Sequence, residues 1–226
     1  MDLNTWAGAR QPERTVLEGR FTRLEPLDAA THGEALFNAV SGPDAERLHR
    51  WLADPVPEDL PGFLERTDAM ARAPDPMFFA VIDRATGRVE GRQSLMDIDT
   101  AHGRAEIGHI LWGPRISRSP VTTEAFFLLT DHAFNLGFRR WQWRCHASNA
   151  LSRNAAARFG FTFEGIFRNH MVVKGKNRDT AWHSILDREW PHLRTGFLDW
   201  LAPSNFDAQG QQRAPLSAFL SASSDI

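Results

Sequence analysis

The sequence contains no tyrosine and only one cysteine, Cys145. A single cysteine excludes an internal disulfide framework and a cysteine-rich zinc site. The absence of tyrosine removes a common phenolic acid from any mechanism that the chain uses. No run approaches the roughly 18 apolar residues that span a membrane, and the N-terminal segment MDLNTWAGARQPER lacks the apolar core of a signal peptide. We therefore expect a protein of the reducing cytoplasm.

Neither sign of charge dominates the chain. With 26 Lys and Arg against 28 Asp and Glu, the formal net charge is -2, which argues against a surface for nucleic acids or anionic membranes. The nine histidines show no H-x-x-x-H or His/Cys spacing, so we expect no metal site. At 42% apolar and 24% charged, the 226 residues are sufficient for one globular domain with appendages.

Hydrophobic periodicity and turn residues suggest an alternation of helices and strands. Strands are expected at 19–27, 77–83, 88–99, 103–112 and 141–146, and helices at 29–40, 58–72, 121–137, 149–159 and 189–201. Residues 163–173 and 179–187 should form a hairpin across the polar turn KGKNR. This order predicts an α+β domain with a mixed sheet. We divide the chain into an N-terminal arm (1–18), a domain (19–190) and a C-terminal helix with a polar tail (191–226).

The segment NALSRNAAARFGF, residues 149–161, is the most informative one for function. Asn149 is a good helix N-cap and Gly160 a good helix end, so the pattern indicates a short helix that follows a strand. Ser152 lies in its first turn. Taken alone, these residues indicate a well-capped helix and nothing more.

Four motifs occur together in order: Ala105-Glu106-Ile107-Gly108-His109, Thr123-Glu124-Ala125, Asn149-x-x-Ser152 and Arg158-Phe159-Gly160-Phe161. From about residue 19 to 190 the chain resembles the GCN5-related N-acetyltransferase (GNAT) superfamily, in the branch of the bacterial ribosomal-protein N-terminal acetyltransferases. The resemblance implies a three-layer fold whose central sheet has a splayed strand pair. It also implies acetyl-CoA as co-substrate and transfer of an acetyl group to a primary amine.

Two residues are candidates for proton transfer. The attacking amine must be neutral, and the resemblance places a general base on the strand that carries Glu106. A solvent-facing carboxylate is the alternative for Glu106, and Asp97 and Asp99 are lesser candidates for the base. The departing thiolate needs a proton, and without tyrosine Ser152 is the first candidate to supply it. Cys145 is a weaker candidate and is expected in the core.

The expected CoA site departs from the family pattern. Where relatives have glycines in the diphosphate loop, this chain has Pro120 and Thr122, with Ser117 at the position of Arg or Gln. A helix that starts at Pro120 still offers backbone N–H groups to an anion. By the resemblance, the strand 110–112 and Asn149 bind the pantetheine arm. The co-substrate residues are therefore Ile110, Leu111, Trp112, Arg115, Arg118, Ser119, Val121, Thr122, Thr123 and Asn149.

Three functions remain open. The leading hypothesis is an acetyl-CoA-dependent N-acetyltransferase with direct attack in a ternary complex, whose acceptor is a peptide N-terminus or a small-molecule amine. The second is a non-catalytic acyl-CoA or nucleotide-binding protein with a degenerate loop. The third is an interaction module whose Trp-rich surface and C-terminal segment (190–226) form the interface of an oligomer such as a homodimer. The acceptor entrance is expected at residues 29–72 and 174–179, with Trp51 and Trp112 available to stack on substrate.

Overall fold

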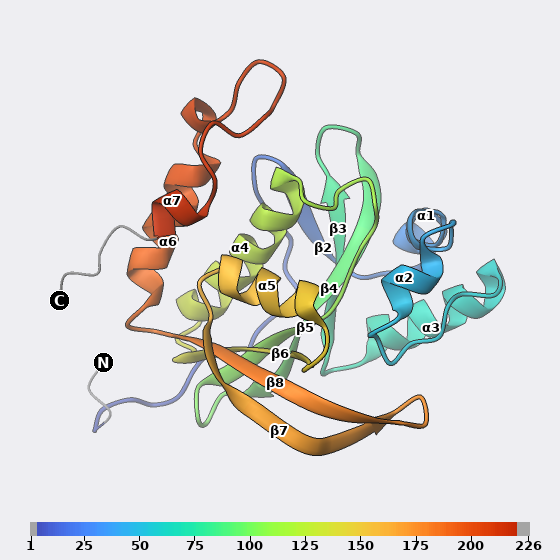
Figure 1. The fold of residues 1–226 in the computed structure, drawn as a ribbon, viewed down its shortest axis with the longest axis horizontal. Coiled ribbons are helices and arrows are strands. Elements are labelled where there is room, and N and C mark those ends of the chain that lie inside the picture. Colours follow the sequence, from blue (N-terminus) through green and yellow to red (C-terminus); the bar gives the residue numbers. More distant parts are fainter. Residues whose placement is uncertain (1–3, 221–226) are drawn as a thin grey trace.

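The computed structural model describes residues 4–220. They form one mixed sheet in the order β1-β2-β3-β4-β5-β6-β8-β7, with helices on both faces (Figure 1). The strands are β1 (Leu17–Glu18), β2 (Thr22–Pro26), β3 (Met77–Asp83), β4 (Arg88–Asp99), β5 (Arg104–Trp112), β6 (Arg140–His146), β7 (Thr162–Val173) and β8 (Lys176–Leu186). The predicted α+β architecture is confirmed.

The helices begin mostly where capping residues predict. They are α1 (Ala29–Val40), α2 (Ala45–His49), α3 (Leu60–Arg72), α4 (Pro120–Asn135), α5 (Ala150–Arg158), α6 (Trp190–Leu201) and α7 (Ser217–Leu220), with a short 3₁₀ helix at Pro203–Asn205. The Asp28 side chain accepts from Thr31 N at the start of α1, and Asp59 accepts from Gly62 N at the start of α3. Within residues 4–220 no helix is long and apolar enough to cross a membrane.

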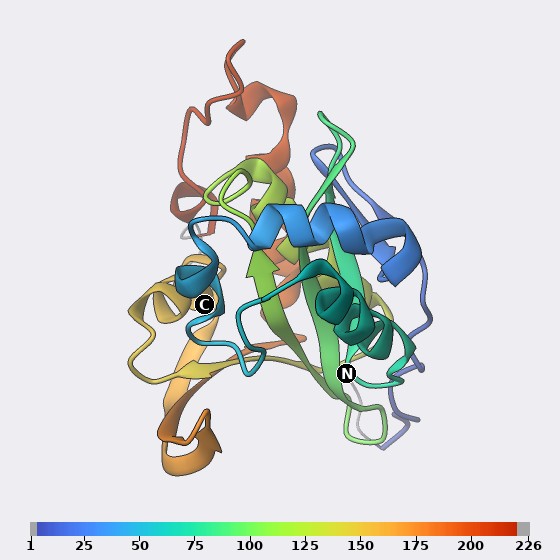
Figure 2. The ribbon, with the colours of Figure 1, turned by 90° about the vertical axis from the view of Figure 1, so that its right-hand side faces the viewer.

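Two hydrophobic clusters hold the helices against the sheet. One face of β3 and β4, including Phe78 and Val89, packs under α1 and α3. The other face packs against α4, α5 and α6 through a larger cluster that includes Phe126, Phe159 and Phe197. Figure 2 shows α1 and α3 crossing one side of the sheet.

The sheet opens between two neighbouring strands, β5 and β6. β5 and β6 are parallel and pair only where Arg104–Glu106 faces Arg140–Gln142. Beyond Glu106 the strands diverge, and β6 continues to pair with β8. A bulge between β4 and β5 turns the β5 backbone, with His109 at φ +49° and a register shift opposite Arg92–Ser94. The strand pair is therefore splayed, with Glu106 at the apex of the gap.

The hairpin of β7 and β8 differs from the expectation. We expected a five-residue turn, KGKNR, but β8 begins at Lys176, and the turn consists of Lys174 and Gly175. Both have positive φ, 50° and 70°, which is the conformation of a two-residue type I′ turn. The Lys174 Nζ donates to the carbonyl oxygen of His49 at 3.1 Å, which ties the hairpin tip to the end of α2. As a result Arg178 lies in a strand and not in a turn.

Candidate active site

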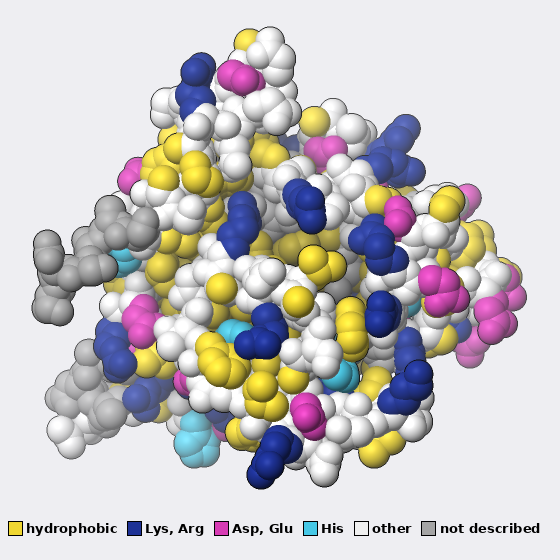
Figure 3. All heavy atoms as spheres, viewed as in Figure 1, with side chains coloured by type: hydrophobic (Ala, Val, Ile, Leu, Met, Phe, Trp, Pro, Cys, Tyr) yellow, Lys and Arg dark blue, Asp and Glu magenta, His cyan; other side chains and the backbone are white. Residues whose placement is uncertain are grey.

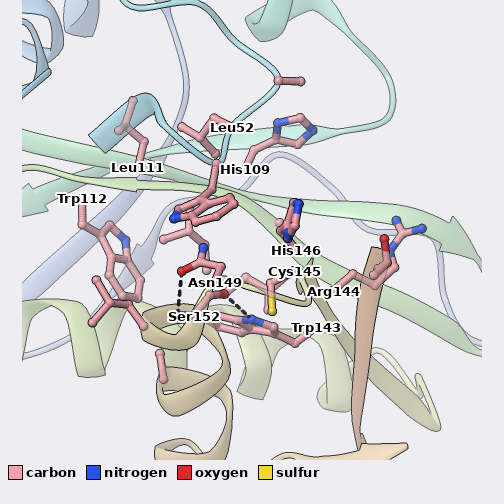
Figure 4. A pocket seen from close by; sticks show the side chains of 18 of the residues that line it. Leu52, His109, Leu111, Trp112, Trp143, Arg144, Cys145, His146, Asn149 and Ser152 are labelled. Atoms are coloured by element: carbon pink, nitrogen blue, oxygen red, sulfur yellow. Dashed lines mark hydrogen bonds between the residues drawn. The ribbon is translucent and has the colours of Figure 1, made fainter. Parts of the chain in front are cut away.

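A cavity of about 830 Å³ occupies the gap between β5 and β6. Its walls come from α2 and the segment after it, from β5 and β6, from α5, and from the β7–β8 hairpin. Figure 4 shows His109, Leu111 and Trp112 on one side and Cys145, His146 and Arg144 on the other, with Asn149 and Ser152 at the start of α5. The cavity thus joins segments that are far apart in the sequence.

Most of the predicted site residues meet in this cavity. Those that line it are Glu106, Ile110, Leu111, Trp112, Arg118, Asn149 and Ser152. The predicted residues Arg115, Ser119, Val121, Thr122 and Thr123 are not among its lining residues. Trp51 also lines the cavity, and its ring lies 4.7 Å from that of His146. Both segments expected at the acceptor entrance contribute to the walls, through residues 47–53 and 178.

Glu106 is a buried carboxyl group, not a solvent-facing one. It is 3% exposed, and burial raises its pKa from 4.5 to about 7, although the Arg144 guanidinium opposes this shift. Glu106 Oε2 forms an ion pair with Arg144 Nε but accepts no hydrogen bond of good geometry within the described part of the chain. Gly108 lies on the same face, since a Cβ added there would be 3.7 Å from Glu106 Oε1. A carboxyl group with a pKa near neutrality, in a cavity, can accept and release a proton under physiological conditions.

Arg144 is fully engaged by its neighbours. Besides Glu106, its guanidinium pairs with Asp97 and lies 4.9 Å from the centre of the Trp182 ring. Asp97 has φ +50° at the register shift between Met96 and Asp99 of β4, and its carboxylate is the second partner of Arg144. Asp99, the other lesser candidate, pairs with His102 and Arg104 and does not line the cavity. The acid in the cavity that is most buried is therefore Glu106.

The start of α5 is held by hydrogen bonds. Asn149 Oδ1 accepts from Ser152 N at 3.2 Å, so the predicted N-cap is present. The Ser152 hydroxyl oxygen accepts from Trp143 Nε1 at 3.0 Å, as the dashed lines of Figure 4 show. Because the indole N–H can only donate, it occupies the Ser152 oxygen as an acceptor and leaves the hydroxyl proton to be donated, with the Cys145 sulfur as one acceptor. Cys145 lies beside Ser152, and burial raises the pKa of its thiol.

The start of α4 differs from the expectation in two ways. The hydroxyls of Thr122 and Thr123 are engaged within the protein, since Thr122 Oγ1 donates to Ser119 O and Thr123 Oγ1 accepts from Arg158. Arg115 does not supply charge to the cavity, because it pairs at 3.1 Å with Glu90, a carboxylate that is 3% exposed. A buried carboxylate without a counter-charge is costly, so the Arg115 guanidinium is used to compensate Glu90. The Ser119 side chain makes no cap hydrogen bond, which leaves the first backbone N–H groups of α4 free of a side-chain cap.

Arg158 lines the cavity, whereas Arg115 does not. Arg158 lies at the end of α5 and donates to Thr123 Oγ1 at 3.2 and 3.1 Å. Burial lowers the pKa of Arg158 from its ordinary value. Figure 3 shows Lys and Arg side chains gathered on the face that carries α4, α5 and α2. Arg158 belongs to a motif that carries the family resemblance, but its contact with the start of α4 depends on tertiary packing and could not be predicted from local sequence.

The segment after α2 is fixed over the cavity by a buried ion pair. Arg92, on β4, is 2% exposed and pairs with Asp54, and it also donates to the His109 carbonyl oxygen at 3.0 Å. Asp54 follows Trp51 and Leu52, which line the cavity. In residues 4–220 no group of three or more His, Cys, Asp or Glu is arranged to hold a metal ion.

Comparison with known proteins agrees with this geometry. Residues 22–162 match the acetyltransferase (GNAT) domain family. The crystal structure of a GCN5-related N-acetyltransferase from Brucella melitensis is 54% identical, covers 96% of this chain and 99% of its own, and superposes with a TM-score of 0.95. YdaF of Bacillus subtilis (strain 168), provisionally named a ribosomal N-acetyltransferase, is 30% identical over 46% of this chain and 57% of its own length.

A second curated relative is the uncharacterized N-acetyltransferase p20 of Bacillus licheniformis. It is 31% identical over 50% of this chain and 63% of its own length, so the chain spans less than two thirds of either curated relative. The resemblance predicted from four short motifs is confirmed by the domain match and by the Brucella structure. The chain belongs to the acetyltransferase (GNAT) family, whose members use acetyl-CoA as co-substrate.

Proposed function

We propose that the protein is an acetyl-CoA-dependent N-acetyltransferase that acts on a primary amine by direct attack in a ternary complex. The observation that carries the proposal is the convergence of Glu106, Asn149 and Ser152 on one cavity at the splayed strands. The acceptor is a peptide N-terminus or a small-molecule amine. A cytoplasmic location and a homodimer remain predictions from the sequence.

Glu106 is the proposed general base. It takes a proton from the attacking amine, directly or through one water, while the amine nitrogen forms its bond to the thioester carbonyl carbon. Its raised pKa of about 7 is close to that of an amine with a pKa near 8, so the transfer is nearly balanced. The Arg144 ion pair holds the carboxylate in place and favours its charged form.

Ser152 is the proposed donor to the leaving group. When the carbon–sulfur bond breaks, the sulfur keeps the electron pair and takes the Ser152 hydroxyl proton, which a water molecule replaces as the proton gained by Glu106 returns to solvent. The Trp143 N–H orients that hydroxyl because it occupies the oxygen as an acceptor. Ser152 and Glu106 therefore serve the two ends of the reacting thioester, the sulfur and the carbonyl carbon.

The co-substrate fits the features of the gap. From Ile107 onward β5 has no pairing with β6, so its backbone groups on that side are open to an extended pantetheine arm. The diphosphate would bind at the start of α4, where backbone N–H groups and the Arg118 and Arg158 side chains favour an anion. This combination replaces the glycine-rich loop of relatives by a proline-started helix and two arginines.

Initial rates of CoA release, measured at several concentrations of acetyl-CoA and of an amine panel, test the proposal. A ternary complex predicts intersecting double-reciprocal lines and an acetylated amine by mass spectrometry. Parallel double-reciprocal lines, together with an acetyl group trapped on Cys145, would contradict direct attack and indicate a covalent acetyl-enzyme intermediate. The matched control is Cys145→Ala, which should keep the activity of the parent. Calorimetric binding of acetyl-CoA without release against the whole panel would favour the non-catalytic alternative.

A further inference from the structure

Three arginines that line the cavity, Arg118, Arg158 and Arg178, form no ion pair within residues 4–220, and of these three only Arg178 has a buried nitrogen without a hydrogen-bond partner. The side chain of Arg178, on β8, lines the cavity and forms no hydrogen bond, ion pair or ring contact with any side chain or backbone group of residues 4–220. Its Nε is shielded from solvent and has no partner. Burial, and then repulsion from Arg144, lowers the pKa of Arg178. A half-buried guanidinium with free donors is costly unless a ligand supplies the missing oxygen atoms.

Neighbouring acids do not supply them. Asp97 and Glu106 both pair with Arg144, and Asp54 pairs with Arg92. Asp179, next to Arg178 in the chain, accepts instead from Asn169 N and Asn177 Nδ2. These four carboxylates form their ion pairs and hydrogen bonds with other groups, and Glu106 acts on Arg178 only by attraction through space.

Deprotonation of the acceptor amine by Glu106 increases the excess of positive charge in the cavity. Once Glu106 has accepted the amine proton it is neutral, and Arg144 retains only Asp97 as a counter-charge. Arg178 and Arg144 then repel each other in the cavity, where both side chains are partly buried and the repulsion is screened less than between fully exposed groups. An acceptor that brings its own negative charge removes this imbalance.

We infer that Arg178 binds an anionic oxygen group of the acceptor, so that the substrate is an amine with a carboxylate or phosphate group near its nitrogen. This inference rests on the proposed acetyl transfer. The guanidinium fork matches two oxygens of a carboxylate or phosphate at once, whereas a neutral amine leaves it unpaired. Trp51, which lines the same cavity, is available for the apolar part of such an acceptor.

The test compares acceptors that differ only in the anion. Phosphoethanolamine is paired with ethanolamine, glycine with glycinamide, and a peptide with aspartate as its second residue with the asparagine version. Each is assayed with the parent protein, with Arg178→Gln, and with Arg168→Gln. Arg168→Gln removes the same positive charge as Arg178→Gln. It serves as the control because Arg168 lies on the same hairpin, is exposed, and does not line the cavity.

We expect the anionic member of at least one pair to be acetylated with a KM about 10- to 100-fold lower than its neutral partner. Arg178→Gln should abolish that difference and leave the KM for acetyl-CoA unchanged, while Arg168→Gln keeps it. The pair that shows the effect distinguishes a phosphate, a free carboxylate and an acidic peptide. Equal use of anionic and neutral amines, or an equal loss for both in Arg178→Gln, would overturn the inference while the proposed function stands.

Failure of the proposed function is recognised separately. If no amine is acetylated although acetyl-CoA binds, calorimetry of phosphoethanolamine and glycine with the CoA-saturated protein decides the fate of the anion site. Binding that is lost in Arg178→Gln and kept in Arg168→Gln supports the site without catalysis. Absence of binding by both probes rejects it.

Discussion

The two ends of the cavity satisfy their polar groups in opposite ways. At the start of α5, Asn149, Ser152 and Trp143 form a closed chain of hydrogen bonds. Around the apex of the splay, Glu106 Oε2 and Arg178 Nε are buried without hydrogen-bond partners among the described residues. One end is complete as it folds, and the other has groups that a ligand would complete. The difference indicates where binding energy is to be gained, because unpaired buried groups have the most to gain from a partner.

The largest effect is expected when the Glu106 carboxylate, at the apex of the splay, is removed. Replacement of Glu106 by Gln should lower kcat about 10²- to 10⁴-fold, because no carboxylate then accepts the amine proton. The parent should show kcat/KM that rises with pH through about 7, as Glu106 loses its proton, and the variant should lose this limb. Steady-state kinetics from pH 5.5 to 9 measure both. Asp97→Asn is the control, with a smaller loss, and equal losses in both variants would contradict the assignment.

The same carboxyl group should make folding depend on pH. In the folded state the pKa of Glu106 is about 7, against 4.5 for an unburied group, so the folded state holds the proton more tightly. The stability from this group is therefore complete below about pH 4.5 and is lost as pH rises to about 7, by about 3 kcal/mol. Denaturant titrations of the parent and of Glu106→Gln at pH 5 and pH 8 isolate the difference. A difference between the two proteins that does not change with pH would refute the prediction.

Substitution of Ser152, at the start of α5, should lower kcat less than substitution of Glu106. Ser152→Ala should lower kcat about 10²-fold, because the leaving sulfur loses its proton donor, while the Kd for acetyl-CoA changes little. Rapid-quench kinetics and calorimetry measure the two quantities. Ser148→Ala alters an exposed hydroxyl four residues earlier and should leave both unchanged. If Ser152→Ala retained the parent kcat, the role of donor would pass to another group.

The smallest effect concerns the anion site at α4. Arg158→Gln should raise the KM for acetyl-CoA about tenfold and leave that for acetyl-pantetheine, which lacks the diphosphate, unchanged. Arg115→Gln makes the same change in charge nearby but should affect only stability, because it leaves Glu90 without its partner. Initial rates with both thioesters, and thermal unfolding, separate the two variants. A higher KM for acetyl-CoA in Arg115→Gln would indicate that Arg115 contributes to acetyl-CoA binding.

Local chemistry explains which parts could be predicted from the sequence. The cap at Asn149 depends on neighbours within four residues, and the element order depends on short periodic patterns, so both could be read from the chain. The burial of Glu106 depends on how β5 and β6 diverge, which no local pattern shows. Arg158 and Arg178 were missed for the same reason. Arg178 was assigned to a turn because the polar run KGKNR hides a two-residue turn followed by a strand.

The hairpin tip also gives the molecule an internal reporter. Lysine occurs only at positions 174 and 176, on either side of the turn glycine. Both lysines are exposed, but the Lys174 Nζ donates to the His49 carbonyl oxygen. Amine-reactive labelling of side chains is therefore confined to this tip, and the ratio of labelling at the two lysines measures how often the hairpin separates from α2. Substrate that closes the cavity should shift that ratio toward Lys176, without any introduced probe.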